Sequence, residues 1–141
     1  MLQAMEILAL DVGAAQVGIA RGSSVARLAE PLKTVKTEDA LAEVQKLIRQ
    51  NEAGAIVVGL PRNLSGEDTG QTRWVRQWVK QAKKEIGRPF YWQDEALTSR
   101  IAAGKDQRLK IKDQRFDEHS LAATTILQDF LNTPQDMRIM C

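Results

Sequence analysis

Alternating and continuous apolar positions along the chain predict five strands, at 6–13, 17–22, 27–35, 55–60 and 90–92. The first holds an unbroken apolar run from Ile7 to Leu10, which is typical of a central strand covered on both faces. Short turns between the first three strands favour an antiparallel meander, with Pro31 near an edge. The strand at 55–60 is also fully apolar, so it too is expected inside the sheet.

Apolar residues at helical spacing predict helices at 37–51, 69–86 and 117–131, with a short one at 98–103. Thr37 is expected to cap the first of these helices, and Asn51 and Gly54 to close it. Asp117 is expected to cap the last helix. Trp74 and Trp78 lie four residues apart beside an apolar stripe, where packing at the core or its rim is expected and base stacking is the alternative.

The resulting order, β-β-β-α-β-α-β-α, is that of an α/β domain with a mixed sheet. A helix separates the meander from the strand at 55–60, which indicates a right-handed crossover to a parallel neighbour of the first strand. The chain shows no internal repeat and no linker, so residues 1–141 are expected to form one domain. Residues 133–141 are expected to be a frayed tail.

Composition excludes several classes of protein. Cys141 is the only cysteine, so an internal disulfide and a zinc site built on thiolates are both excluded. This cysteine usage agrees with a reducing cytosol, and a cytoplasmic location is expected. No apolar run reaches the length of a membrane span and the first residues lack a signal-peptide pattern, so no membrane association is expected.

Charge is more informative in its distribution than in its sum, because the formal net charge is only +2. One basic segment carries Arg100, Lys105, Arg108, Lys110, Lys112 and Arg115. A second set comprises Arg73, Arg76, Lys80, Lys83, Lys84 and Arg88. A solvated helix face and a surface loop account for such runs, and contact with nucleic acid is the alternative. The loop at 59–66, which carries Arg62, leaves a strand where ligands commonly bind.

Acidic residues follow two strands and begin one helix: Asp11, Glu95 and the region of Asp117. A turn aspartate that caps its own backbone is an alternative explanation for Asp11. The carboxyl ends of parallel strands meet at one edge, so these acids could converge there. Clustered carboxylates repel unless a divalent ion joins them, and oxygen ligands favour Mg²⁺ or Mn²⁺. Two such ions about 4 Å apart support phosphodiester cleavage.

Taken together, the motifs resemble the YqgF/RuvX family, a ribonuclease H-like group known as Holliday-junction resolvases and pre-16S rRNA processing nucleases. The matching pieces are Leu10-Asp11-Val12-Gly13, Val17-Gly18-Ile19-Ala20, Glu30-Pro31-Leu32, Val57-Val58-Gly59-Leu60-Pro61-Arg62-Asn63, Gly66, Asp94-Glu95-Ala96-Leu97-Thr98-Ser99 and Ala122-Ala123-Thr124-Thr125-Ile126-Leu127-Gln128. The similarity extends from about residue 5 to residue 131. It implies a ribonuclease H-like fold with a five-stranded mixed sheet in the order 3-2-1-4-5.

The resemblance also assigns metal ligands. Asp11 matches the family's first metal-binding aspartate, and Glu95 matches the glutamate of its Asp-Glu-Arg motif. The family's third acid precedes an Ala-Ala pair by three residues, and that position here is His119. Asp117 or Glu118 could serve instead, and His119 could itself bind a metal, Mn²⁺ more readily than Mg²⁺. A surface or capping histidine is the simpler explanation of His119.

Two further positions depart from the family pattern. Ala96 replaces the arginine beside the glutamate, and Gln16 stands where a basic residue is usual. Both changes would weaken the grip on phosphates or the orientation of the site.

These expectations lead to a metal-dependent endonuclease acting on structured RNA, during maturation of pre-16S rRNA or on a ribosomal subunit precursor. Asp11, Glu95 and Asp117 would be catalytic, while Arg62, Arg100 and the basic residues of 105–115 would hold phosphates. A resolvase of branched DNA, which would need a homodimer rather than a monomer, is one alternative. Another is an inactive nucleic-acid-binding module. A fragment of an actin-like ATPase is a remote third, because the chain is too short for two lobes.

Overall fold

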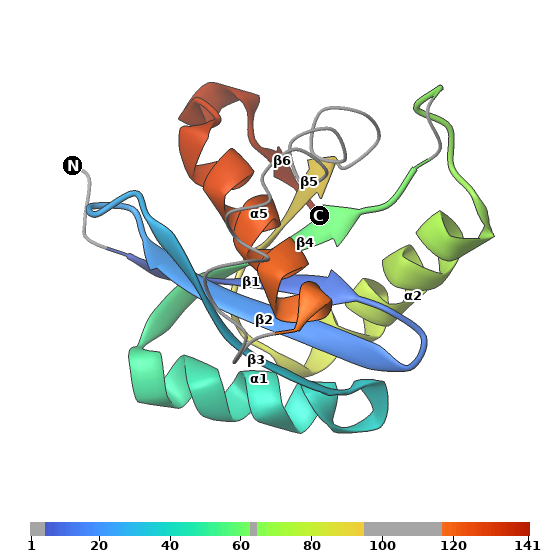
Figure 1. The fold of residues 1–141 in the computed structure, drawn as a ribbon, viewed down its shortest axis with the longest axis horizontal. Helices are drawn as coiled ribbons and strands as arrows, with labels where there is room; N and C mark the ends of the chain where they lie inside the picture. The colour runs from blue at the N-terminus through green and yellow to red at the C-terminus, as the bar shows by residue number, and fades with distance from the viewer. Residues whose placement is uncertain (1–4, 63–64, 95–116) are drawn as a thin grey trace.

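The computed structural model describes residues 5–62, 65–94 and 117–141. Strands and helices follow one another in the predicted order (Figure 1). The elements are β1 (Glu6–Val12), β2 (Gln16–Ser23), β3 (Ala29–Lys36), α1 (Thr37–Asn51), β4 (Ala53–Leu60), α2 (Gly70–Glu85), β5 (Phe90–Asp94), α5 (Glu118–Asn132), the 3-10 turn η1 (Gln135–Met137) and β6 (Ile139–Met140). The short helix expected at 98–103 lies outside the described residues.

The sheet has the strand order β3-β2-β1-β4-β5-β6. The strands β1, β2 and β3 form the predicted antiparallel meander, and β4 and β5 continue the sheet parallel to β1. The predicted order 3-2-1-4-5 is therefore confirmed, and so is the position of Pro31 on an edge strand. The strands β1, β4 and β5 end together at one edge of the sheet, the carboxyl edge.

The sixth strand was not predicted, and the expectation of a frayed tail from residue 133 is wrong. In β6, Met140 pairs with Tyr91 and Ile139 pairs with Trp92 in antiparallel fashion. The Cys141 amide donates to the Phe90 carbonyl at 2.9 Å. Without this tail, the outer edge of β5 would present unpaired backbone groups, and the tail satisfies part of that edge.

Both faces of the sheet are covered, as the apolar run of β1 predicts. Leu8 and Leu10 enter a core formed with α1 and α2, while Ile7 and Ala9 enter a second core formed with α5. Successive side chains of a strand point to opposite faces, so one continuous run serves both cores. In Figure 1, α5 crosses one face of the sheet, whereas α1 and α2 form the layer on the other face.

The ends of α1 differ from the prediction. Lys36, and not Thr37, is its N-cap residue, and Lys36 contributes no side-chain hydrogen bond. The Thr37 hydroxyl instead donates to the Gly13 carbonyl at 2.7 Å, which fastens the turn after β1 to the start of α1. The helix closes at Glu52, in the left-handed region with φ 53°, while Gly54 lies within β4.

The start of α2 is fixed by a reciprocal pair of hydrogen bonds between Thr69 and Thr72, and the Thr72 hydroxyl also donates to the Pro61 carbonyl. Trp78 is partly buried against the first core, as expected, whereas Trp74 is 40% exposed. None of the described helices combines the length and apolar character needed to cross a bilayer.

Candidate active site

The site is built on one row of paired residues that crosses the meander near the carboxyl edge. Asp11 of β1 is paired with Gly18 of β2, and Gly18 is paired with Thr34 of β3. Directly paired residues present their side chains to the same face of a sheet. The first turn of α5 rests on this row, because a Cβ at Gly18 would lie only 2.0 Å from the His119 carbonyl oxygen. The missing side chain at Gly18 therefore allows the start of α5 to approach the sheet.

Asp117 anchors that first turn. Its Oδ1 accepts hydrogen bonds from the His119 and Ser120 amides, both at 3.1 Å, and from the Thr34 hydroxyl of β3. Burial pushes the pKa of Asp117 upward, but these hydrogen bonds and the charge of His119 outweigh it, so the pKa lies below its ordinary value. The predicted cap is confirmed, and these contacts hold α5 to β3.

Asp11 faces His119. The distance from Asp11 Oδ2 to His119 Nδ1 is 3.8 Å, and the two side chains are 27% and 34% exposed. Burial raises the pKa of Asp11 above its ordinary value; His119 offsets this rise in part, and the charge of Glu118 adds to it. The ionised form of Asp11 is thus stabilised by any cation that binds next to it.

A divalent ion needs more ligands than these two. Among residues 5–62, 65–94 and 117–141, no three His, Cys, Asp or Glu side chains lie close enough together to hold a metal ion. Glu95 lies outside the described residues, but it directly follows Asp94, the last residue of β5 at the carboxyl edge. Asp11 and His119 offer one oxygen and one nitrogen donor, a set that suits Mn²⁺ better than Mg²⁺.

Arg62 lies at the same edge but contacts carboxylates. Its Nη1 is 3.3 Å from Asp94 Oδ2, and its Nε is 3.4 Å from Asp68 Oδ1. These ion pairs connect the loop after β4 to the end of β5. A role of Arg62 in binding phosphates stays a prediction, and any phosphate there would compete with Asp68 and Asp94.

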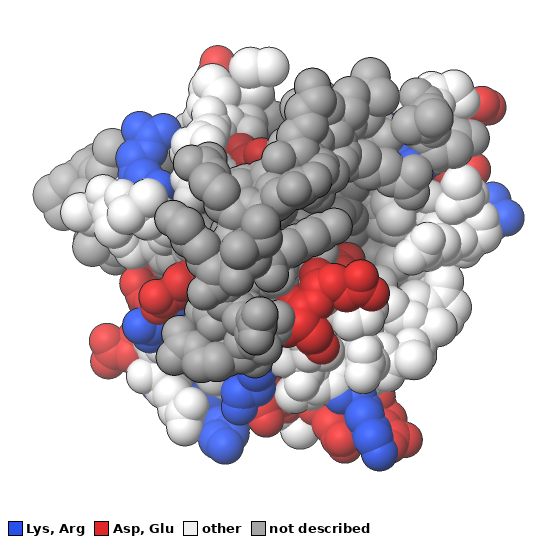
Figure 2. Space-filling model, viewed as in Figure 1, with Lys and Arg blue, Asp and Glu red and all other residues white. Residues whose placement is uncertain are grey.

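The other predicted nucleic-acid contacts lie outside the described residues: Arg100, Lys105, Arg108, Lys110, Lys112 and Arg115. Figure 2 shows Asp and Glu side chains near the middle of the face that carries α5, whereas Lys and Arg are dispersed towards its rim. On the described part of this face, the cations do not form a continuous surface.

Sequence reasoning missed Thr34 and Gly18 as parts of the site. A signal for Gly18 was present, because a glycine inside an apolar strand indicates close approach of another backbone. No local signal marks Thr34, because its role comes from pairing with Gly18 and from the distant Asp117.

The mixed sheet in the order 3-2-1-4-5, with helices on both faces and an aspartate at the end of its central strand, defines the ribonuclease H-like class. The fold is similar to that of RuvC from Thermus thermophilus, solved in complex with a Holliday junction substrate. The TM-score is 0.66, with 16% identity over 97% of this chain and 99% of that one. At this level of identity the likeness concerns the fold.

The family follows from the sequence comparisons. The model of the RuvX family, described as Holliday junction resolvase, matches residues 5–133, and the chain belongs to this family. A relative from Roseiflexus sp. (strain RS-1), named "Putative pre-16S rRNA nuclease", is 37% identical over 134 residues, covering 90% of this chain and 94% of the relative. A relative of the same name from Oleidesulfovibrio alaskensis is 35% identical over 141 residues, covering 96% and 97%.

Proposed function

We propose that this protein is a metal-dependent endonuclease that hydrolyses phosphodiesters of structured RNA, in the maturation of the 5′ end of pre-16S rRNA. The observation that carries the proposal is the partly buried Asp11 at the end of the central strand, facing His119 in a chain of the RuvX family. The names of its relatives support the choice of RNA. With this substrate the expected location is the cytoplasm, where a reduced Cys141 thiol is stable.

In this proposal Asp11, His119 and Glu95 hold Mg²⁺ or Mn²⁺. A bound divalent ion would activate water and stabilise charge on the phosphate that is cleaved. Partial burial makes the ionised form of Asp11 costly in the free protein, which favours binding of a cation next to it. Asp117 is a positioning residue, because it fixes the turn that presents His119.

The first test is cleavage of an end-labelled precursor-16S fragment with Mg²⁺ or Mn²⁺. Asp11→Asn is expected to lower the rate at least ~100-fold, because the ligand at the centre of the site is lost. Asp39→Asn is the matched control, since Asp39 is exposed on α1. Full activity of Asp11→Asn would remove this residue from the mechanism.

The second test concerns the third ligand. If His119 contacts the metal, the wild-type protein should work better with Mn²⁺ than with Mg²⁺, and His119→Asp should shift this preference towards Mg²⁺. Asp117→Asn should then lower the free energy of unfolding and leave the affinity for the metal almost unchanged. An unchanged metal preference in His119→Asp, together with lost metal binding in a folded Asp117→Asn, would assign the third ligand to Asp117.

Branched DNA is the second candidate substrate, because the family is described as Holliday junction resolvase and the fold is shared with RuvC. Symmetric cutting of two strands needs two sites, so this activity requires a homodimer. Parallel assays with a four-way junction and with precursor rRNA, together with a mass measurement in solution, separate the two substrates. Salt-dependent RNA binding without cleavage under any metal condition would instead indicate a binding module.

A further inference from the structure

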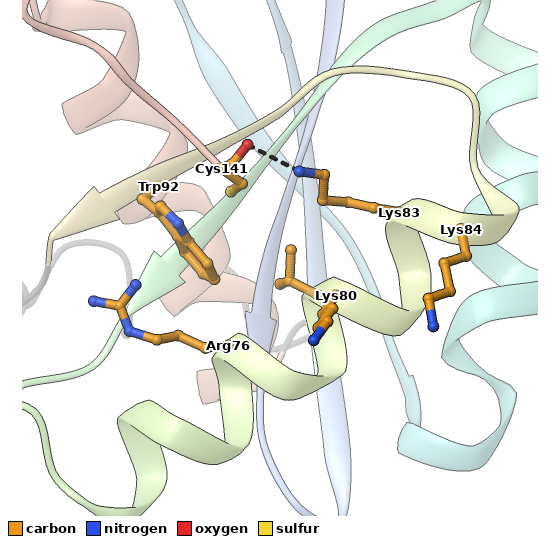
Figure 3. Close-up of a pocket in the computed structure, with 7 residues that line it drawn as sticks. Arg76, Lys80, Lys83, Lys84, Trp92 and Cys141 are labelled. Carbon is orange, nitrogen blue, oxygen red and sulfur yellow. Dashed lines mark hydrogen bonds between the residues drawn. The ribbon is translucent and has the colours of Figure 1, made fainter.

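A second feature outside the Asp11 region is a basic pocket between α2 and the outer edge of the sheet. The pocket has a volume of about 390 Å³ and is lined chiefly by Arg76, Lys80, Lys83, Lys84, Trp92 and Cys141 (Figure 3). Among the described residues, no acidic side chain belongs to its lining. Its volume is in the range of pockets that hold small ligands or single nucleotides.

The four cations come from one side of α2. Lys80 follows Arg76 by four residues, and Lys83 and Lys84 follow Lys80 by three and four, so the cations lie along one face of the helix. Like charges at this spacing repel each other. Arg76 Nε is 3.1 Å from Asp68 Oδ2, and Lys83 Nζ donates to the Cys141 carbonyl at 2.9 Å. Lys80 and Lys84 also belong to the lining of the pocket (Figure 3). An anion bound there would relieve their mutual repulsion.

The presence of Trp92 in the lining favours a nucleic acid over other anions as the ligand of this pocket. Its partly exposed indole forms a wall of the pocket, and the Arg76 guanidinium lies 5.6 Å from the ring centroid. A flat aromatic wall next to several cations suits a nucleobase stacked on the ring with its phosphates on the cations. An acidic peptide or an inorganic anion would use the cations alone, whereas a nucleobase would also use the exposed part of an indole that otherwise packs against the first core and under Arg76.

The pocket is connected to the carboxyl edge. Trp92 and Asp94 are two residues apart on β5, so they share a face and lie about 7 Å from each other. A chain of ion pairs also leads there, because Asp68 contacts both Arg76 at the pocket and Arg62, which contacts Asp94. Trp92 faces the α2 side of the sheet and Asp11 faces the α5 side, so a nucleic acid strand that contacts both would pass over the carboxyl edge at the end of β5.

We propose that the pocket is a nucleotide subsite for a single-stranded segment flanking the cleaved bond, with one base against Trp92 and phosphates on Lys80, Lys84 and Arg76. This inference rests on the proposed function in that it needs a nucleic acid substrate. It adds a requirement for an unpaired flank, which the Asp11 region alone does not provide.

The test compares two labelled RNA hairpins, one blunt and one with an eight-nucleotide uridine tail, by fluorescence anisotropy in EDTA, so that no cleavage occurs. The wild-type protein should bind the tailed hairpin more tightly. Lys80→Glu/Lys84→Glu should weaken its binding about tenfold or more and lower the slope of log affinity against log salt by about 1.4. Lys46→Glu/Arg49→Glu, on the exposed side of α1, is the charge-matched control and should affect both hairpins slightly and equally.

A second readout addresses the indole. The uridine tail should quench tryptophan fluorescence in the wild-type protein and in Trp74→Phe, but not in Trp92→Phe, whose folding is checked by its melting temperature. Equal binding of both hairpins by the wild-type protein, equal losses in the two charge-reversal pairs, or unchanged quenching in Trp92→Phe would each overturn the subsite. Failure of the wild-type protein to bind or cut any nucleic acid would overturn the proposed function itself.

Discussion

A methyl group at position 18 tests whether the start of α5 rests directly on β2. In Gly18→Ala the added Cβ would lie 2.0 Å from the His119 carbonyl oxygen, 2.2 Å from its carbonyl carbon and 2.7 Å from the Ser120 amide nitrogen. All three are backbone atoms, so no change of rotamer relieves the overlap. Because ordinary contact begins at 3.4 Å, the first turn of α5 must retreat by about 1.4 Å.

The cost follows from two effects. Overpacking of this kind costs about 1–3 kcal/mol, and the retreat also stretches the hydrogen bond from Thr34 to Asp117, which contributes about 1 kcal/mol. We therefore expect Gly18→Ala to lower the free energy of unfolding by about 2–4 kcal/mol. For a domain of this size the melting temperature should fall by about 6–12 °C.

Thermal and urea unfolding followed by circular dichroism measure this loss. Gly87→Ala is the matched control, because Gly87 is exposed and a Cβ there would meet no atom within 4 Å. The control should change the free energy of unfolding by less than about 1 kcal/mol, with a small gain expected from the stiffer unfolded chain. A Gly18→Ala protein that melts together with the wild type would refute the close approach of α5, and with it the placement of His119.

Three further predictions concern the same region and α2. In EDTA, Asp11→Asn should have a higher melting temperature than the wild type at pH 7, because burial raises the pKa of Asp11 and its ionised form destabilises the fold. The difference should vanish near about pH 3, where the carboxyl is protonated in the folded and in the unfolded protein. Equal melting temperatures at pH 7 would contradict this. Asp117→Ala should lower the free energy of unfolding by about 1–2 kcal/mol. Adding Thr34→Val should lower it little further, because both substitutions remove the same hydrogen bond between Thr34 and Asp117. Fully additive losses in urea unfolding would argue against this bond. Thr69→Ala should lower the free energy of unfolding by about 1 kcal/mol, because it removes the hydrogen bond that the Thr72 amide donates to Thr69. An unchanged midpoint of urea unfolding would show that this cap contributes nothing.

The strand order could be predicted because it depends on patterns within short segments and on chirality. The apolar run of β1 requires cover on both faces, and a helix between β3 and β4 requires a crossover. Those two constraints leave little choice for the centre of the sheet. They say nothing about the outer edge, where two residues of β6 pair with β5 through the backbone and remain exposed.

Local capping rules were right at Asp117 and wrong at Thr37 for a physical reason. At the start of α5 the capping carboxylate accepts hydrogen bonds from two amides of its own helix. At the start of α1 the Thr37 hydroxyl donates its hydrogen bond to a distant acceptor, the Gly13 carbonyl. A tertiary hydrogen bond of this kind competes with the local cap and cannot be recognised from neighbouring residues.

The position of Asp11 was predictable from the end of an apolar strand, but its partner was not. Which residue of 117–119 faces Asp11 depends on how α5 is rotated over the meander. Asp117 is the N-cap residue, with extended backbone, so its carboxylate lies over the first turn and accepts hydrogen bonds from the His119 and Ser120 amides, whereas His119 belongs to the helix itself. With the start of α5 fixed above Gly18 of β2, Asp117 reaches Thr34 on β3, and His119 turns towards Asp11 on β1. The same contact that makes Asp117 a good anchor therefore directs it away from Asp11, which is why the phase of α5 favours His119 as the neighbour of any ion held there.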